Sequence, residues 1–235
     1  MSRVHLGYGS EWHMLRYLGR HRRLLTERVL ELTGGSSIKW CDFDFTKGIS
    51  PEQNYGDAEL KGLNFLQSNH PARAAWSKWW PQTGNVQNWD AVGIHRTEGG
   101  VEEWLLVEAK GNVSELESVT KAKERGGLPA IRRCLSETRK AFGVVLERDW
   151  TKPYYQYANR LAVLHFLEDS GVPARLLFVY FTGDCARSRI CPAGDAEWEP
   201  GLAVMKSNLG LTGTSLLDQK IHHLFLPVVL EEGRH

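Results

Sequence analysis

The pattern of apolar and polar positions along the chain alternates between helical and strand-like periodicity. From Ser10, a residue suited to cap a helix, apolar side chains recur at helical spacing up to Thr33, and Gly34-Gly35 ends the pattern. The same criteria predict further helices over residues 51–67, 71–80, 114–124, 129–142, 153–170 and 200–208. The helical segments are separated by stretches in which the pattern of apolar residues is that of β-strands.

Two strand-like runs, residues 89–96 and 103–110, are joined by Thr97-Glu98-Gly99-Gly100, which is typical of a hairpin. Residues 175–182 are apolar enough for a strand buried on both faces. Weaker strand patterns occupy residues 37–45 and 221–229. Strands interleaved with helices predict a single α/β domain with no internal repeat and no long linker.

The composition of the chain restricts the classes of function that it can have. The chain has 235 residues, of which 42% are hydrophobic, and 29 Lys+Arg against 28 Asp+Glu give a net charge of +1. Such a charge produces no global attraction to nucleic acid, so any polyanion site must be local. The run Arg20-His21-Arg22-Arg23 and the cluster Trp76-Ser77-Lys78-Trp79-Trp80 are two such places, although a solvated helix face and core packing are the preferred interpretations.

Neither a membrane span nor a secretory signal is evident, and four scattered cysteines do not form a disulfide framework. We therefore expect a soluble cytoplasmic protein with reduced thiols. The spacing of Cys185 and Cys191 does not favour zinc, and His222-His223 on a strand point to opposite faces. The sequence also lacks the glycine-rich motifs of dinucleotide-binding and phosphate-binding loops.

An acid-any-lysine triplet occurs three times, at residues 59–61, 108–110 and 218–220. Of these, Glu108-Ala109-Lys110 alone ends a strand-like run, where residues two apart project to the same side of a sheet. Glu108 and Lys110 are therefore expected to stand together, with Ala109 facing the other way.

The hairpin places a second acid beside this triplet. If residues 98–100 form the turn, Thr97 faces Val101 and Asp90 lies directly opposite Glu108, with Cβ atoms about 4.5–5.5 Å apart. A turn of two or four residues would instead put Asp90 on the opposite face. Two carboxylates so close repel each other unless a cation lies between them, and oxygen ligands suit Mg²⁺ or Mn²⁺.

Asp90 followed by Glu108-Ala109-Lys110 on the next strand resembles the PD-(D/E)XK nuclease superfamily, which has the restriction-endonuclease-like fold. Trp89 stands where the family name has proline. The resemblance implies a central mixed β-sheet flanked by helices, with a catalytic core over residues 51–182, a helical N-terminal elaboration over 1–50 and a C-terminal extension over 183–235. It also implies a nuclease that hydrolyses phosphodiester bonds with Mg²⁺ or Mn²⁺.

By position, the resemblance makes Asp90 and Glu108 metal ligands, the main-chain carbonyl of Ala109 a further ligand, and Lys110 the catalytic lysine. Many members carry an acid on the helix before the hairpin, for which Glu59 is the best match and Glu52 the fallback. Some branches carry a glutamine on a later helix, which matches Gln156. The tyrosine expected four residues later is replaced by Arg160, which would share a helical face with Gln156 and could meet phosphate oxygens.

The expected function is thus a divalent-metal-dependent nuclease acting on DNA. Two alternatives stay open: a nuclease that acts on RNA, and a non-catalytic nucleic-acid-binding or regulatory module on the same fold. No membrane partner is expected. The sequence does not distinguish endonuclease from exonuclease action, and it leaves a homodimer open without revealing an interface.

Overall fold

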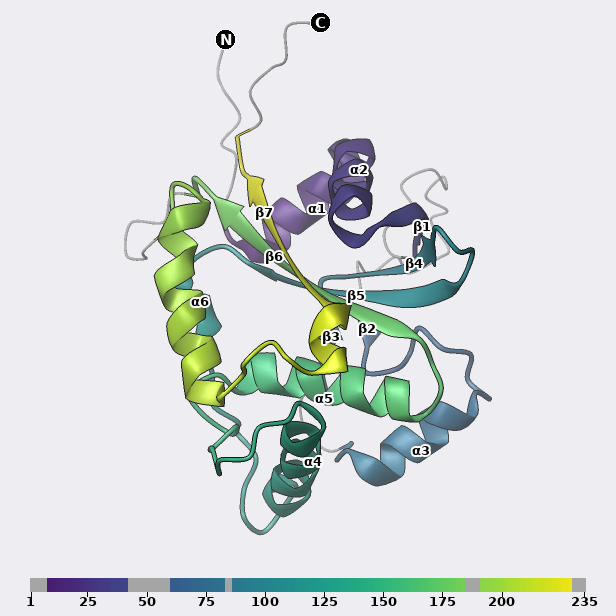
Figure 1. The fold of residues 1–235 in the computed structure, drawn as a ribbon, viewed down its shortest axis with the longest axis vertical. Helices are drawn as coiled ribbons and strands as arrows, with labels where there is room; N and C mark the ends of the chain where they lie inside the picture. The colour runs from purple at the N-terminus through teal and green to yellow at the C-terminus, as the bar shows by residue number, and fades with distance from the viewer. Residues whose placement is uncertain (1–7, 42–59, 83–85, 185–190, 230–235) are drawn as a thin grey trace, which may run out of the picture.

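A mixed β-sheet forms the middle layer of the molecule (Figure 1). The structure is a computed structural model, and it describes residues 8–41, 60–82, 86–184 and 191–229. The five strands of the sheet lie in the order β1-β4-β5-β6-β7. They are β1 (Gly35–Trp40), β4 (Ala91–Thr97), β5 (Glu102–Lys110), β6 (Ala174–Thr182) and β7 (Ile221–Pro227). β1, β4 and β5 pair antiparallel, whereas β5, β6 and β7 pair parallel. The predicted α/β class is confirmed.

Helices cover both faces of this sheet (Figure 1). One face carries α1 (Ser10–Arg20) and α2 (Arg22–Thr33). The other carries α3 (Pro71–Trp79), α4 (Leu128–Ala141), α5 (Tyr155–Asp169) and α6 (Asp195–Leu209). Two short 3₁₀ turns, η1 (Val113–Leu116) and η2 (Leu216–Lys220), and the strand pair β2 (Leu60–Lys61) and β3 (Asn88–Trp89) complete the described elements. None of the described helices has the length and apolar character needed to cross a membrane.

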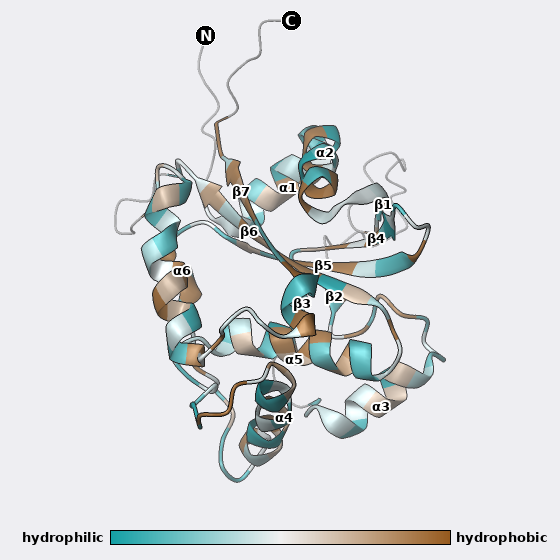
Figure 2. Ribbon diagram, viewed as in Figure 1, coloured by the Kyte–Doolittle hydropathy of each residue, from teal (hydrophilic) through white to brown (hydrophobic). Residues whose placement is uncertain are grey.

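The alternation of side chains along β5 divides the core into two parts. Leu105, Val107 and Ala109 pack in the cluster beneath α1 and α2, and Leu106 packs in the cluster beneath α5. Figure 2 shows hydrophobic stretches in the central strands, between the two helical layers. Residues of even number in this strand therefore face α5, which is the face that Glu108 and Lys110 share.

The hairpin between β4 and β5 has the predicted three-residue turn. The main-chain N–H of Thr97 donates to the carbonyl of Val101 at 2.9 Å, and Gly100 has a φ of 81°. A glycine accepts this left-handed conformation without the strain that a side chain would add. The pairing of Ala91 with Val107 is in the predicted register, so this local prediction is confirmed.

The predicted helix over residues 10–33 is wrong in one respect, because it breaks at His21 into α1 and α2. Ser10 is the first residue of α1 and makes no side-chain cap; Gly9 occupies the cap position. An unbroken helix of this length would extend about 36 Å. The break instead lets both apolar faces pack on the same sheet, and Gly34 ends α2 in the left-handed conformation as predicted.

Two other predicted helices are wrong, because their main chains pair with residues that are distant in the sequence. The described end of the predicted helix 51–67 forms β2, which pairs with β3, and the turns that follow it. The predicted helix 114–124 reduces to η1. Beyond η1 the N–H of Thr120 donates to the carbonyl of Thr151 at 3.1 Å, so hydrogen bonds across the chain replace helical ones.

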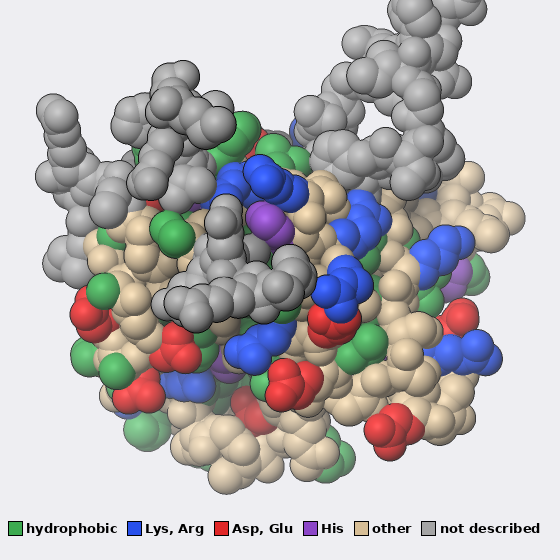
Figure 3. All heavy atoms as spheres, turned by 90° about the horizontal axis from the view of Figure 1, so that it is seen from above, with side chains coloured by type: hydrophobic (Ala, Val, Ile, Leu, Met, Phe, Trp, Pro, Cys, Tyr) green, Lys and Arg blue, Asp and Glu red, His purple; other side chains and the backbone are tan. Residues whose placement is uncertain are grey.

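The remaining helices and strands agree with the predictions to within a few residues, apart from α6, which begins at Asp195 rather than residue 200. The predicted strand 37–45 is described only as far as residue 41, and its last part lies outside the described residues. The tryptophan cluster belongs to the core, since Trp76 and Trp80 are buried and stack on each other. In the basic run, Arg23 pairs with Glu27 at 2.7 Å, one helical turn away. Figure 3 shows acidic and basic side chains sharing the face seen from the α1–α2 side.

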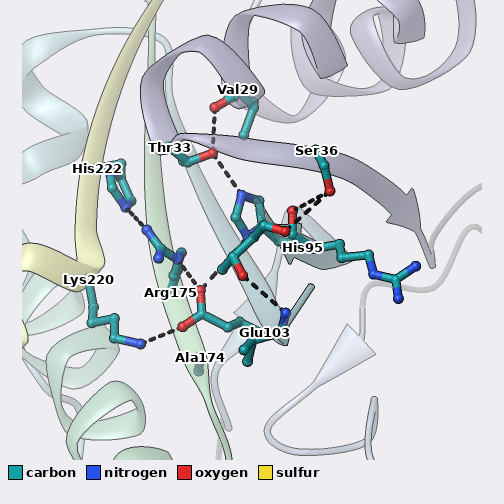
Figure 4. Close-up of polar contacts among 12 residues, drawn as sticks. Val29, Thr33, Ser36, His95, Glu103, Ala174, Arg175, Lys220 and His222 are labelled. Atoms are coloured by element: carbon teal, nitrogen blue, oxygen red, sulfur yellow. Dashed lines mark hydrogen bonds and ion pairs between the residues drawn. The ribbon is translucent and has the colours of Figure 1, made fainter. Parts of the chain in front are cut away.

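A buried polar network lies at the β4–β5 hairpin end of the sheet (Figure 4). The carboxylate of Glu103 pairs with Arg175 from β6 and with Lys220. His95 Nε2 lies 2.9 Å from Thr33 Oγ1, and Arg175 Nη1 lies 3.1 Å from His222 Nε2. The network therefore joins α2 and four strands.

We expect Glu103→Gln to lower the free energy of unfolding by about 2 kcal/mol, because two cations lose their carboxylate. Burial alone would raise the pKa of Glu103, but hydrogen bonds and charges from Lys220 and Arg175 hold it below the usual range. The stabilisation is therefore present at neutral pH and lost as the pH falls through that lowered pKa. Urea unfolding at pH 7 and below pH 4 measures this.

Glu102→Gln is the matched control, because Glu102 is the exposed neighbour on the same strand. Equal stability of the two variants at pH 7 would contradict a structural role for the Glu103 network.

Candidate active site

The end of β5 brings an acid and a lysine together on the face that α5 covers. The side chain of Glu108 is 4% exposed, and its Oε1 accepts a hydrogen bond from Lys110 Nζ. The predicted side-by-side arrangement of Glu108 and Lys110 is thus present. Ala109 packs beneath α1 and α2, on the other face, as predicted.

Helix α5 supplies a second cation to the same carboxylate. Arg160 Nη2 lies 2.6 Å from Glu108 Oε2, and Nε donates to the same oxygen at 2.8 Å. The guanidinium also donates to the main-chain carbonyl of Asn88 and to the side chain of Asn159, and its Cζ lies 4.8 Å from the centre of the Trp89 ring. Arg160 is therefore held in one position by several groups.

Gln156, one turn before Arg160 on α5, reaches the lysine. Lys110 Nζ donates to Gln156 Oε1 at 2.8 Å. The main-chain N–H of Gln156 is bound by Ser118 Oγ at 2.7 Å, which ties the start of the helix to the segment after η1. The expected shared face of Gln156 and Arg160 is present, and both residues lie beside the Glu108–Lys110 pair.

Asp90 lies where the chain passes from β3 into β4, one residue before the paired register begins. Its N–H donates to the carbonyl of Val107 at 3.1 Å, and its Oδ2 accepts from the N–H of Ala109 at 2.6 Å. Within the described ranges, Oδ1 receives no hydrogen bond. The side chain of Asp90 is thus fixed against the strand that carries Glu108.

The two carboxyl groups have opposite pKa shifts. Burial and the neighbouring charge of Glu108 raise the pKa of Asp90 to about 7, although the Ala109 N–H and two cations oppose the shift. Burial alone would also raise the pKa of Glu108, but Arg160 and Lys110 together hold it below its usual value. At neutral pH Glu108 is ionised, and Asp90 is close to its midpoint.

This donor set fits a divalent cation at Asp90. The charge of Glu108 works against ionisation of Asp90, a bound cation would favour it, and Oδ1 of Asp90 accepts no other hydrogen bond in the described part of the chain. Asp90 and Glu108 would hold such an ion. The described residues contain no cluster of three or more His, Cys, Asp or Glu placed to bind a metal, so water or substrate oxygens would complete its coordination.

The structure accounts for most of the predicted site residues. Asp90, Glu108, Lys110 and Gln156 converge, whereas Glu59 and its fallback Glu52 lie outside the described residues. The sequence analysis missed the ion pair between Arg160 and Glu108. Two features of the sequence pointed to a place for Arg160 at the site. One is its four-residue spacing from Gln156, and the other is the aromatic Trp89 beside Asp90, over whose ring the guanidinium lies.

Comparison with protein-family models, with curated proteins and with solved structures gives no significant match for this chain. The function is therefore argued from the geometry of the site.

We expect Asp90→Asn to stabilise the protein more at pH 8 than at pH 5, with a difference on the order of 2 kcal/mol. The folded state retains the Asp90 proton up to about pH 7, whereas an unfolded Asp loses it near pH 4. The stability of the parent protein thus falls as the pH rises between these values, and Asn removes that fall. Thermal unfolding at both pH values measures the difference.

Asp169→Asn, at the exposed end of α5, is the control and should give the same change in melting temperature at pH 5 and pH 8. If Asp90→Asn also gives equal changes at the two pH values, the raised pKa of Asp90 is wrong.

Proposed function

We propose that this chain is a divalent-metal-dependent nuclease of the PD-(D/E)XK type, on a restriction-endonuclease-like core, that hydrolyses phosphodiester bonds in DNA. The observation that carries the proposal is the convergence of Asp90, Glu108 and Lys110 at adjacent strand ends, with Asp90 Oδ2 fixed 2.6 Å from the N–H of Ala109. Groups with strongly shifted pKa values cluster at functional sites, and the pKa of Asp90 is raised to about 7.

In this proposal Asp90 and Glu108 hold Mg²⁺ or Mn²⁺, with the main-chain carbonyl of Ala109 as a further ligand, and Glu59 remains a candidate from outside the described residues. The bound ion would lower the pKa of a coordinated water and stabilise charge on the phosphate. Lys110, held by Gln156 at 2.8 Å, orients the attacking water or donates to a phosphate oxygen. Gln156 is thus a positioning residue for Lys110.

The proposal predicts that Mg²⁺ or Mn²⁺ supports cleavage of plasmid or single-stranded DNA by the parent protein. Asp90→Ala should abolish both metal binding and cleavage, because a ligand is lost. Lys110→Ala should retain metal binding and lose about 10²-fold or more of the cleavage rate, since a group acting on the reacting atoms is lost. Gel-based cleavage assays and calorimetric metal titrations measure the two properties separately.

Lys140→Ala, an exposed change on α4, is the control and should cleave at the parental rate. Cleavage by Lys110→Ala at that same rate would show that the catalytic assignment is wrong. An RNA oligonucleotide of the same sequence tests the alternative substrate.

One observation favours a second candidate function, a nucleic-acid-binding module without hydrolysis. Both carboxylate oxygens of Glu108 are already bound by cations, Oε1 by Lys110 and Oε2 by Arg160. If Arg160 keeps this position, Glu108 does not become a metal ligand and its charge is neutralised by the protein alone.

The two functions differ in how Mg²⁺ affects stability. A nuclease site predicts that millimolar Mg²⁺ raises the melting temperature, because the ion binds the folded state, and that Asp90→Ala abolishes the rise. An arginine-occupied site predicts no rise in the parent protein. Differential scanning calorimetry with Mg²⁺ and with EDTA distinguishes these outcomes.

A further inference from the structure

A groove of about 900 Å³ opens beside the Glu108–Lys110–Arg160 cluster. Gln156 and Arg160 form part of its wall, so the groove adjoins the groups to which the nuclease function was assigned. Asn88, Tyr155 and the segment after η1 line further parts of its described surface. A ligand that enters this groove would therefore approach the proposed catalytic residues.

The wall of the groove is positively charged, although the protein as a whole has a net charge of only +1. Lys61 from β2 and Lys121 from the segment after η1 lie on it and are exposed, and Arg160 lies at its base with its charge committed to Glu108. None of the described residues that line the groove is an aspartate or a glutamate. A local wall of this kind attracts an anionic chain without a strong global field.

Gln87 adds a second, independent sign of a ligand. It lines the groove and is 4% exposed, and its buried side-chain oxygen has no hydrogen-bond partner among the described residues. An unpaired buried amide oxygen costs about 1–3 kcal/mol, which a donor on a bound ligand would recover. Amide side chains pair with the donor and acceptor groups on the edges of nucleobases.

The burial of Glu108 and Lys110 favours a single strand over a duplex as the ligand. Glu108 and Lys110 are 4% and 8% exposed and do not line the groove themselves, but Gln156 and Arg160, which contact them, do. A phosphate inside the groove would therefore approach them from this wall. The phosphates of a duplex are held on a stiff rod and cannot enter one at a time, whereas the nucleotides of an unpaired strand can turn inward separately.

We propose that this groove binds a single-stranded segment of nucleic acid, with Lys61 and Lys121 contacting phosphates and Gln87 contacting a base edge. This inference deepens the proposed function, because it names the form of substrate that the nuclease would cut. It does not depend on cleavage itself, since the groove residues bind the strand without metal.

The test is fluorescence anisotropy of the full chain with a labelled 12-nucleotide strand in EDTA. We expect the single strand to bind at least tenfold more tightly than its duplex. Lys61→Ala/Lys121→Ala should weaken binding about tenfold and reduce the slope of log K against log salt by about 1.4, or about 0.7 for each lost phosphate contact. Gln87→Ala should weaken binding without changing that slope.

Lys140→Ala, which removes an exposed lysine outside the groove, is the control and should bind as the parent does. Unchanged melting temperatures confirm that the lysine variants fold. Equal or tighter binding of duplex, or equal binding by the double variant and Lys140→Ala, would overturn the groove assignment. Strands of DNA and RNA with one sequence identify which nucleic acid the groove prefers.

The two proposals fail separately. Tight single-strand binding in EDTA with no cleavage in Mg²⁺ supports the groove and rejects the nuclease. Mg²⁺-dependent cleavage that the double lysine variant carries out at the parental rate supports the nuclease and rejects the groove.

Discussion

The buried carboxylate of Glu108 imposes the main constraint on this half of the structure. A charge that is 4% exposed must be neutralised and hydrogen-bonded, and both of its cations come from fixed positions. Lys110 follows on the same strand, and Arg160 comes from α5. Because Arg160 also binds the carbonyl of Asn88 and stacks on Trp89, this one carboxylate links β5, α5 and β3.

The same strand contains a second buried glutamate, Glu103, that also pairs with two cations. The differences between Glu103 and Glu108 distinguish a structural network from a candidate site. Glu103 pairs with Arg175 and Lys220, and its pKa is lowered, as is that of Glu108. Within the described residues, however, His95 and not a second carboxylate lies opposite Glu103, and Glu103 does not line the groove. Glu108 has Asp90 close by, between β3 and β4, and lies beside a groove. The ion pair alone is therefore not what marks the site.

The local parts of the site could be predicted from the sequence. The three-residue turn determines the hairpin register, and the period of two along β5 places Glu108 and Lys110 on one face. These inferences hold because they need only neighbouring residues and a single turn. The proximity of Gln156 also followed, but only through the resemblance to a family and not from spacing.

The parts that could not be predicted depend on contacts between distant segments. The segment after η1 has the composition of a helix, yet Thr120 bonds to Thr151 across the chain. The spacing of Arg160 from Gln156 places it on the helical face at the site, but it does not identify Glu108, which lies 52 residues earlier, as its partner. Long-range pairing of this kind depends on how whole elements pack, and local propensity does not encode it.

Two groups at the site are energetically unfavourable in the folded protein, and this supports a ligand-binding function for the site. The pKa of the Asp90 carboxyl group is raised to about 7, and the side-chain oxygen of Gln87 has no donor among the described residues. The fold needs neither feature, since the two hydrophobic clusters on either side of the sheet are formed by other residues. Energetically unfavourable groups at a functional site are relieved when the ligand binds. Asp90 lies against the strand that carries Glu108, and Gln87 lines the adjoining groove, so a cation and an unpaired nucleotide together would relieve both.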